Sequence, residues 1–81
     1  MKYNAFVTIR LKKGILDPEG LNTKKALELL GFSAVSDVRT SKVFEITLDA
    51  PSKDAAKAQI DSMCMRLLIN PVVNDYTVRF E

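Results

Sequence analysis

Histidine and tryptophan are absent from this chain, and cysteine occurs only once, at Cys64. The absence of histidine removes the commonest general base near neutral pH and the commonest protein ligand for metal ions. Because a lone cysteine cannot form an internal disulfide, the fold must be held by packing or by association with other chains. Catalysis of the usual kinds is therefore disfavoured, and a reducing, cytoplasmic setting is expected.

Glycines are also few, at Gly14, Gly20 and Gly31, and acidic residues are scattered singly along the chain. This pattern contains neither a phosphate-binding P-loop nor a dinucleotide-binding fingerprint, and it lacks the clustered ligands of a metal site. With no histidine to activate it, Cys64 is interpreted as a small buried hydrophobic residue rather than as a nucleophile. We therefore expect no catalytic, cofactor-binding or metal-binding residue in this chain.

Charge of either sign is not in large excess, since 12 basic and 10 acidic residues give a formal net charge of +2. The chain has 81 residues, of which 47% are hydrophobic and 27% are charged, so we expect a single domain over residues 1–81. No apolar run resembles a signal peptide or is long enough to span a bilayer, and no membrane contact is expected. The charge balance is also unlike that of a dedicated nucleic-acid binder.

One short basic cluster, formed by Arg10, Lys12 and Lys13, lies at the end of the first predicted strand. Two interpretations are open: the cluster contacts phosphates, as in an RNA-binding module, or it is the solvated end of a strand. RNA-binding sheets of this kind stack bases on exposed aromatic side chains, and only Phe6 is available here. The residues favour the solvated strand end, and no nucleic-acid partner is expected.

Alternation of apolar and polar residues predicts the strands. It extends over residues 3–11, 42–49 and 74–80, with the period of a strand that buries one face. A shorter strand is predicted over residues 35–40, and the link through Ser41 is short enough for a hairpin, although it lacks an Asn-Gly turn signal.

Capping signals predict two helices. Asp17 caps a helix that begins at Pro18 and ends at about Leu30, and Ser52 caps a second helix that continues to about Ile69. The resulting order is βαββαβ. It predicts an α+β, ferredoxin-like fold, in which a four-stranded antiparallel sheet forms a two-layer sandwich with both helices on one face.

The second predicted helix carries two apolar stripes. At 100° per residue, the core stripe contains Ile60, Met63, Cys64, Leu67 and Leu68. On the opposite side of the helix lie Ala58, Met65 and Ile69. One small sheet cannot bury both stripes, so the second stripe is either an exposed patch or a contact with another chain, and we expect the contact.

Several segments of this sequence together resemble a known family. They are residues 12–20 (KKGILDPEG), 26–27, 30–32 (LGF), 35–39 (VSDVR), 63–64, 67–68 and 70–76 (NPVVNDY). In their order and over almost the whole chain they are similar to PurS, the small subunit of phosphoribosylformylglycinamidine synthase. The function expected from this resemblance is that of a subunit without chemistry of its own.

The resemblance implies a step of purine biosynthesis in which formylglycinamide ribonucleotide, glutamine and ATP give formylglycinamidine ribonucleotide, glutamate, ADP and phosphate. It implies two partners, a glutaminase subunit (PurQ) that releases ammonia and a synthetase subunit (PurL) that activates the substrate with ATP. PurS joins the two, so ATP, Mg and glutamine would be used by the partners and no cofactor by this chain. The resemblance also implies a homodimer or a homotetramer.

The resemblance gives the loop residues Asp17, Pro18 and Gly20 a second interpretation beside helix initiation, because the loop that they shape can present a docking surface to the large subunit. With the outer stripe of the second helix they make up the predicted subunit interface: Asp17, Pro18, Gly20, Ala58, Met65 and Ile69. Two other classes of function remain as alternatives, a regulatory domain of βαββαβ fold that senses a small ligand, and an RNA-binding module.

Overall fold

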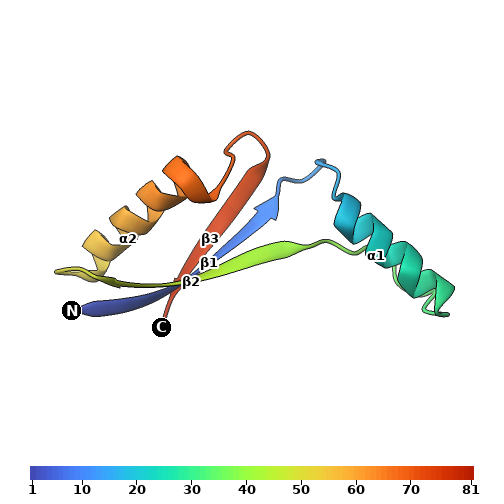
Figure 1. Ribbon diagram of the computed structural model, residues 1–81, viewed down its shortest axis with the longest axis horizontal. Helices are drawn as coiled ribbons and strands as arrows, with labels where there is room; N and C mark the ends of the chain where they lie inside the picture. The colour runs from blue at the N-terminus through green and yellow to red at the C-terminus, as the bar shows by residue number, and fades with distance from the viewer.

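The structure is a computed structural model that describes residues 1–81. Its elements are β1 (Lys2–Leu11), α1 (Pro18–Leu29), β2 (Ser41–Asp49), α2 (Lys53–Met63), the π-helical turn η1 (Cys64–Leu68) and β3 (Asn74–Phe80). The three strands form one antiparallel sheet in the order β2-β1-β3 (Figure 1). The α+β class, the two helices and the three longer strands are confirmed, but the sheet has three strands where four were predicted.

Local signals account for the bounds of both helices. The side chain of Asp17 accepts the N–H of Gly20 and Pro18 occupies the first position of α1, while Ser52 accepts the N–H of Ala55 at the start of α2. After α1, Gly31 adopts φ 99°, a left-handed conformation that only glycine reaches without strain. The predicted caps are therefore the ones that the structure uses.

The predicted strand over residues 35–40 is wrong. These residues join no ladder, and the chain continues through them into β2 without the reversal that a hairpin requires. The physical reason is that the N–H of Thr40 donates to the side chain of Asp17, so the segment is bound to the start of α1 instead of to a neighbouring strand. Consequently β2 is an edge strand, whose outer backbone groups have no partner within the sheet.

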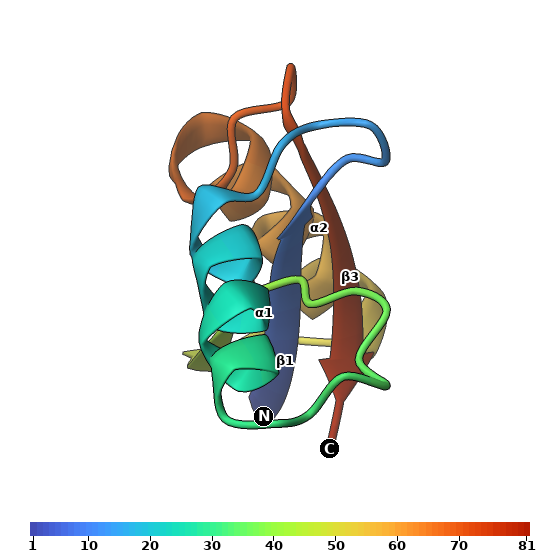
Figure 2. The same cartoon turned by 90° about the vertical axis from the view of Figure 1, so that its right-hand side faces the viewer.

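The two helices do not lie side by side on the sheet, as the ferredoxin-like arrangement requires. Helix α2 covers one face of the sheet, whereas α1 lies beyond the end of β1, alongside the segment that leads into β2 (Figures 1 and 2). The molecule therefore measures 51 × 26 × 14 Å, with a radius of gyration of 16.3 Å. A compact domain of this length has a radius of gyration of about 12 Å. The prediction that both helices cover the sheet is wrong for α1.

The hydrophobic core lies between the sheet and α2. Alternation along β1 turns Ala5, Val7 and Ile9 toward the helix, where they pack against Ile60 and Cys64. Half-buried side chains from every remaining strand and from η1 surround this cluster: Phe44, Ile46, Leu48, Met63, Leu68, Ile69, Tyr76, Val78 and Phe80. Burial raises the pKa of the Cys64 thiol above its ordinary value, which agrees with a packing role for this residue.

The end of α2 departs from the predicted helical wheel. In η1 the chain is π-helical, and the N–H of Ile69 donates to the carbonyl of Cys64 at 3.0 Å from an extended backbone (φ −123°, ψ 158°). A π turn is wider than an α turn, so a spacing of 100° no longer gives side-chain directions. Ile69, placed on the outer stripe by the wheel, packs against the core, whereas Leu67, placed inside, is 82% exposed because α1 does not lie beside α2.

Replacing Ile60 by alanine tests whether this small core holds the fold. Ile60 is fully buried, so Ile60→Ala should lower the free energy of unfolding by about 2–5 kcal/mol through lost burial and a cavity. The matched control is Gln59→Ala at the neighbouring, exposed position of α2, which should change it by less than about 0.5 kcal/mol. Urea denaturation followed by circular dichroism measures both, and equal midpoints for the two variants would contradict the core assignment.

Candidate functional site

Asp17 binds the start of α1 to the segment that leads into β2. Its Oδ1 accepts the N–H of Gly20 at 2.9 Å, while its Oδ2 accepts both the N–H of Thr40 at 2.7 Å and the hydroxyl of Thr40 at 2.9 Å. The residue is only 8% exposed. Hydrogen bonds from the backbones of Thr40 and Gly20 hold the pKa of this carboxyl below its ordinary value. One carboxylate thus caps a helix and fixes a segment 23 residues away.

Gly20 lets α1 approach that segment closely. A Cβ atom at this position would lie 2.2 Å from the carbonyl oxygen of Val38, a distance that real side chains do not reach. Glycine is thus required here for space. Asp17 and Gly20 are consequently buried inside the contact, and of the three predicted docking residues in this loop only Pro18 is exposed.

Arg39 also helps to hold the segment before β2 in place, through hydrogen bonds to backbone carbonyl oxygens. Its Nη2 lies 3.3 Å from the carbonyl oxygen of Ile15 and 3.5 Å from those of Leu11 and Lys12, at the end of β1 and in the loop that follows it. Together with Asp17, Gly20, Val38 and Thr40, it forms what we call the α1 junction. Sequence analysis identified Asp17 and Gly20 but missed Val38, Arg39 and Thr40, because their contacts are distant in sequence and leave no local signal.

Beyond the α1 junction, α1 leaves its apolar side chains in solvent. Leu29 is 90% exposed, and Leu30 and Phe32 are also largely exposed. These side chains have no layer of the sheet beneath them, because α1 lies beyond the end of the sheet (Figure 1). Exposed apolar side chains gathered at one end of a small protein are typical of a surface that contacts another chain.

A second exposed apolar surface lies on α2 and η1. Met65 is 54% exposed, Leu67 is more exposed still, and Ala58 also faces solvent. Of the three residues predicted for the outer stripe, Ala58 and Met65 are therefore open to a partner, whereas Ile69 is half-buried against the core. Leu67, two positions after Met65, is exposed on a different side of η1.

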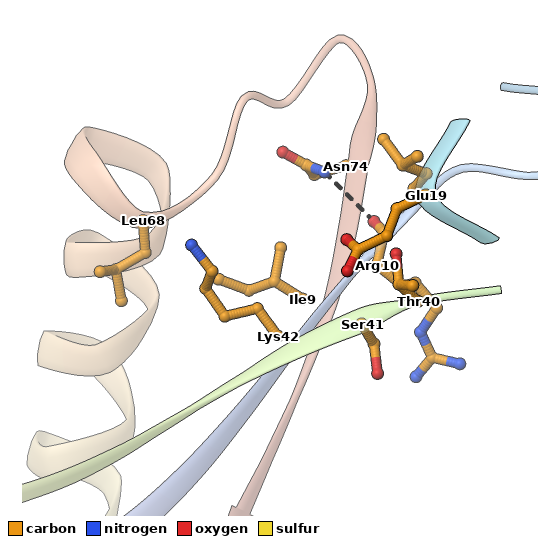
Figure 3. Close-up of a pocket in the computed structure, with 9 residues that line it drawn as sticks. Ile9, Arg10, Glu19, Thr40, Ser41, Lys42, Leu68 and Asn74 are labelled. Atoms are coloured by element: carbon orange, nitrogen blue, oxygen red, sulfur yellow. Dashed lines mark hydrogen bonds between the residues drawn. The ribbon is translucent and has the colours of Figure 1, made fainter. Parts of the chain in front are cut away.

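A cleft of about 500 Å³ lies between these two surfaces, where a ferredoxin-like fold would place the first helix. In Figure 3, Ile9 and Leu68 lie on its inner side, and Glu19 lies where α1 begins. The lining carries both an acidic and a basic charge, from Glu19 and Lys42, and the cleft is widely open. An open cleft of this kind suits contact with a protein surface rather than binding of a small molecule in an enclosed pocket.

Features of metal binding and of membrane insertion are not found. No three histidine, cysteine, aspartate or glutamate side chains come together in a way that could hold a metal ion. Neither α1 nor α2 combines the length and the apolar character that crossing a bilayer takes.

Comparison with known proteins identifies relatives over nearly the whole chain. The PurS family, described as phosphoribosylformylglycinamidine (FGAM) synthase, matches residues 4–81. The phosphoribosylformylglycinamidine synthase subunit PurS of Archaeoglobus fulgidus is 50% identical over 74 residues, which cover 91% of this chain and 92% of that protein. The PurS subunit of Methanocaldococcus jannaschii is 42% identical over 79 residues, covering 98% and 95%.

Solved structures share the elongated arrangement. The crystal structure of M. jannaschii PurS, one of the subunits of formylglycinamide ribonucleotide amidotransferase, superposes with a TM-score of 0.87 at 42% identity and covers 98% of this chain and 95% of that chain. A chain in the structure of PurLQS from Thermotoga maritima superposes with a TM-score of 0.92 at 25% identity, covering 100% and 99%. Because these matches span the whole chain, the placement of α1 beyond the sheet is shared with them.

Replacing Asp17 by asparagine tests the α1 junction through its pH dependence. The pKa of Asp17 is lower in the folded chain than its ordinary value of 3.8, so its contribution to stability is present above that value and is lost as the pH falls through the folded pKa. Asp17→Asn should therefore lower the thermal midpoint at pH 7, and the difference from the wild type should shrink toward pH 3.

The control for this variant is Asp75→Asn, at an exposed position of β3 whose side chain makes neither a hydrogen bond nor an ion pair. Its thermal midpoint should follow that of the wild type at both pH values. A difference between Asp17→Asn and the wild type that stays constant from pH 7 to pH 3 would contradict the proposed origin of the stabilisation.

Replacing Gly20 by alanine tests the close approach of α1 to the backbone of Val38. Because the added Cβ would meet a carbonyl oxygen rather than a flexible side chain, Gly20→Ala should destabilise the chain by about 1–3 kcal/mol, although alanine favours helices elsewhere. Lys25→Ala, at an exposed position of the same helix, is the matched control and should be nearly neutral. Chemical denaturation measures the stability of both variants. A Gly20→Ala variant more stable than the wild type would show that α1 does not approach the backbone of Val38 so closely.

Proposed function

The chain belongs to the PurS family and is a subunit of phosphoribosylformylglycinamidine synthase (EC 6.3.5.3), an enzyme of purine biosynthesis, and we propose that it is the non-catalytic assembly subunit of that enzyme. In this proposal the two exposed apolar surfaces, on α1 and on α2 with η1, hold the catalytic subunits and further copies of the chain together. The chemistry of the reaction then belongs entirely to the partners.

The large accessible surface of the isolated chain is the main support for this proposal. Only 9 of 81 residues are buried, and the accessible surface is 5884 Å². A compact monomer of 9.1 kDa exposes about 4900 Å². The excess surface includes strongly exposed leucines on two separate elements, Leu29 on α1 and Leu67 on η1. A chain that leaves this much apolar surface in water completes its packing against other chains.

The partners are a glutaminase subunit, PurQ, and a synthetase subunit, PurL. The similarity to a chain of the T. maritima PurLQS structure supports this pairing. Ammonia released by a glutaminase must reach the synthetase site without escaping to water or being protonated. A subunit that fixes the geometry of the two sites and excludes water can therefore be required for turnover without touching a reacting atom.

The same surfaces support self-association into a homodimer or a homotetramer. Helix α1 extends away from the sheet, and β2 and β3 are both edge strands. We expect ATP, Mg²⁺ and glutamine to be bound by the partner subunits and no cofactor by this chain. We also expect the chain to work in the cytoplasm, in keeping with a single cysteine that is unpaired and buried.

Introducing charge into the α2 surface tests the assembly role. Met65→Glu combined with Leu67→Glu places a carboxylate at an exposed apolar position on each of two sides of η1 without touching the core, so the fold should be kept while self-association or binding to the large subunit weakens. We expect a loss of about tenfold or more in affinity, because burying an unpaired charge at an interface is costly. Light scattering gives the mass of the chain, and glutamine-dependent turnover of the reconstituted enzyme reports on the complex.

A matched control adds the same charge away from the outer stripe of α2. Gln59→Glu combined with Thr77→Glu changes two exposed polar positions, one on another side of α2 and one on β3, and should leave mass and turnover unchanged. If the Met65 and Leu67 variant also kept its mass, its affinity for the synthetase and its support of glutamine-dependent turnover, the assignment of this surface to assembly would be wrong.

A further inference from the structure

A second cleft, of about 270 Å³, opens on the face of the sheet that α2 leaves bare. Its lining is wholly polar and consists of Thr8, Arg10, Arg39, Thr40 and Ser41. Three pieces of chain meet there: the end of β1, the start of β2 and the segment of the α1 junction between them. Figure 3 shows the guanidinium of Arg10 beside Ser41, on the opposite side of the strands from Leu68.

The two guanidinium groups of this cleft have no carboxylate partner. The four ion pairs of the chain all involve other residues, and the side chain of Arg10 makes no hydrogen bond within the chain. Asp75 is opposite Arg10 in the register of β1 and β3, yet it forms no ion pair with it. Asp17 attracts Arg39 at longer range, but neither guanidinium is in direct contact with a carboxylate, so both remain able to pair with a bound anion.

The donors of the cleft are partly held in place before any ligand binds. Arg39 directs Nη2 at three carbonyl oxygens at the end of β1 and in the loop that follows it, which leaves Nε and Nη1 as donors. The hydroxyl of Thr40 already donates to Asp17, whereas those of Thr8 and Ser41 make no hydrogen bond within the chain. A guanidinium fixed by folding loses little further freedom on binding, which favours affinity.

We propose that Arg10, Arg39, Thr8 and Ser41 form a binding site for a phosphate group. The fork of Arg10, the free Nε and Nη1 of Arg39 and two hydroxyls offer more donors than a planar carboxylate accepts, and they suit the several oxygens of a tetrahedral oxyanion. The five residues that line the cleft are all polar, and the guanidinium of Arg79 lies over the nearby ring of Phe6 at 4.8 Å. With no aromatic side chain in the lining, the site recognises the phosphate itself rather than a base, and it is independent of the proposed assembly function.

Titration of the full-length chain with inorganic phosphate tests this site. Sodium phosphate replaces sodium chloride at constant ionic strength and pH, and amide and arginine Nε–H shifts are followed by NMR. Saturable shifts are expected at residues 8–10 and 39–41 and at the side chains of Arg10 and Arg39. Arg10→Ala should weaken the binding about tenfold or more, and since this guanidinium bonds to nothing in the chain, the spectrum elsewhere should be preserved.

Matched variants and ligands separate the site from general attraction to a basic surface. Arg66→Ala removes an exposed arginine of η1 and should bind phosphate as the wild type does, while Thr8→Val should bind a few-fold more weakly. If ADP shifts the same amide signals and binds with higher affinity than inorganic phosphate, the phosphate group is that of a nucleotide. Equal affinities for ADP and inorganic phosphate would identify free phosphate as the ligand. Shifts that grow without saturation, or that saturate equally in Arg10→Ala, would overturn the proposal.

Discussion

The carboxylate of Asp17 is the interaction on which the shape of this molecule depends. By accepting the N–H of Gly20 and both donors of Thr40, it ends the loop after β1, starts α1 and binds the segment that precedes β2. That segment is then unavailable as a fourth strand, and α1 lies beyond the end of the sheet instead of on it (Figure 1). The exposed leucines of α1 and of η1, and the cleft between them, follow from this one arrangement.

This arrangement explains how a chain without histidine or a glycine-rich loop belongs to an enzyme. A core of five buried residues supports a rigid sheet and helix, and the α1 junction holds a second helix at a fixed distance from them. Such a frame can set the positions of two larger proteins while contributing nothing to bond making. The large exposed surface of the isolated chain and its usefulness in an assembly have the same cause, which is an apolar surface that other chains can cover.

Much of this structure could be predicted from the sequence, namely the features with local causes. Alternation located three strands, and the caps at Asp17 and Ser52 located the starts of both helices. The errors have non-local causes: Val38 and Thr40 contact α1 rather than a strand, and the π turn of η1 moves Ile69 inward. Arg10 was recognised as basic, but Arg39, which shares its cleft, is 29 positions away in sequence and becomes a neighbour only in the folded chain.

The central claim, that this chain assembles the enzyme but takes no part in its chemistry, is tested most directly by comparing two nitrogen donors. Turnover by the synthetase subunit is measured with ammonia or with glutamine and the glutaminase subunit, each with and without this chain. The account predicts that ammonia supports turnover whether or not the chain is present, whereas glutamine supports it only when the chain is added. Loss of the ammonia-supported reaction in the absence of the chain would contradict the account, because it would show that the chain contributes to the chemical step itself.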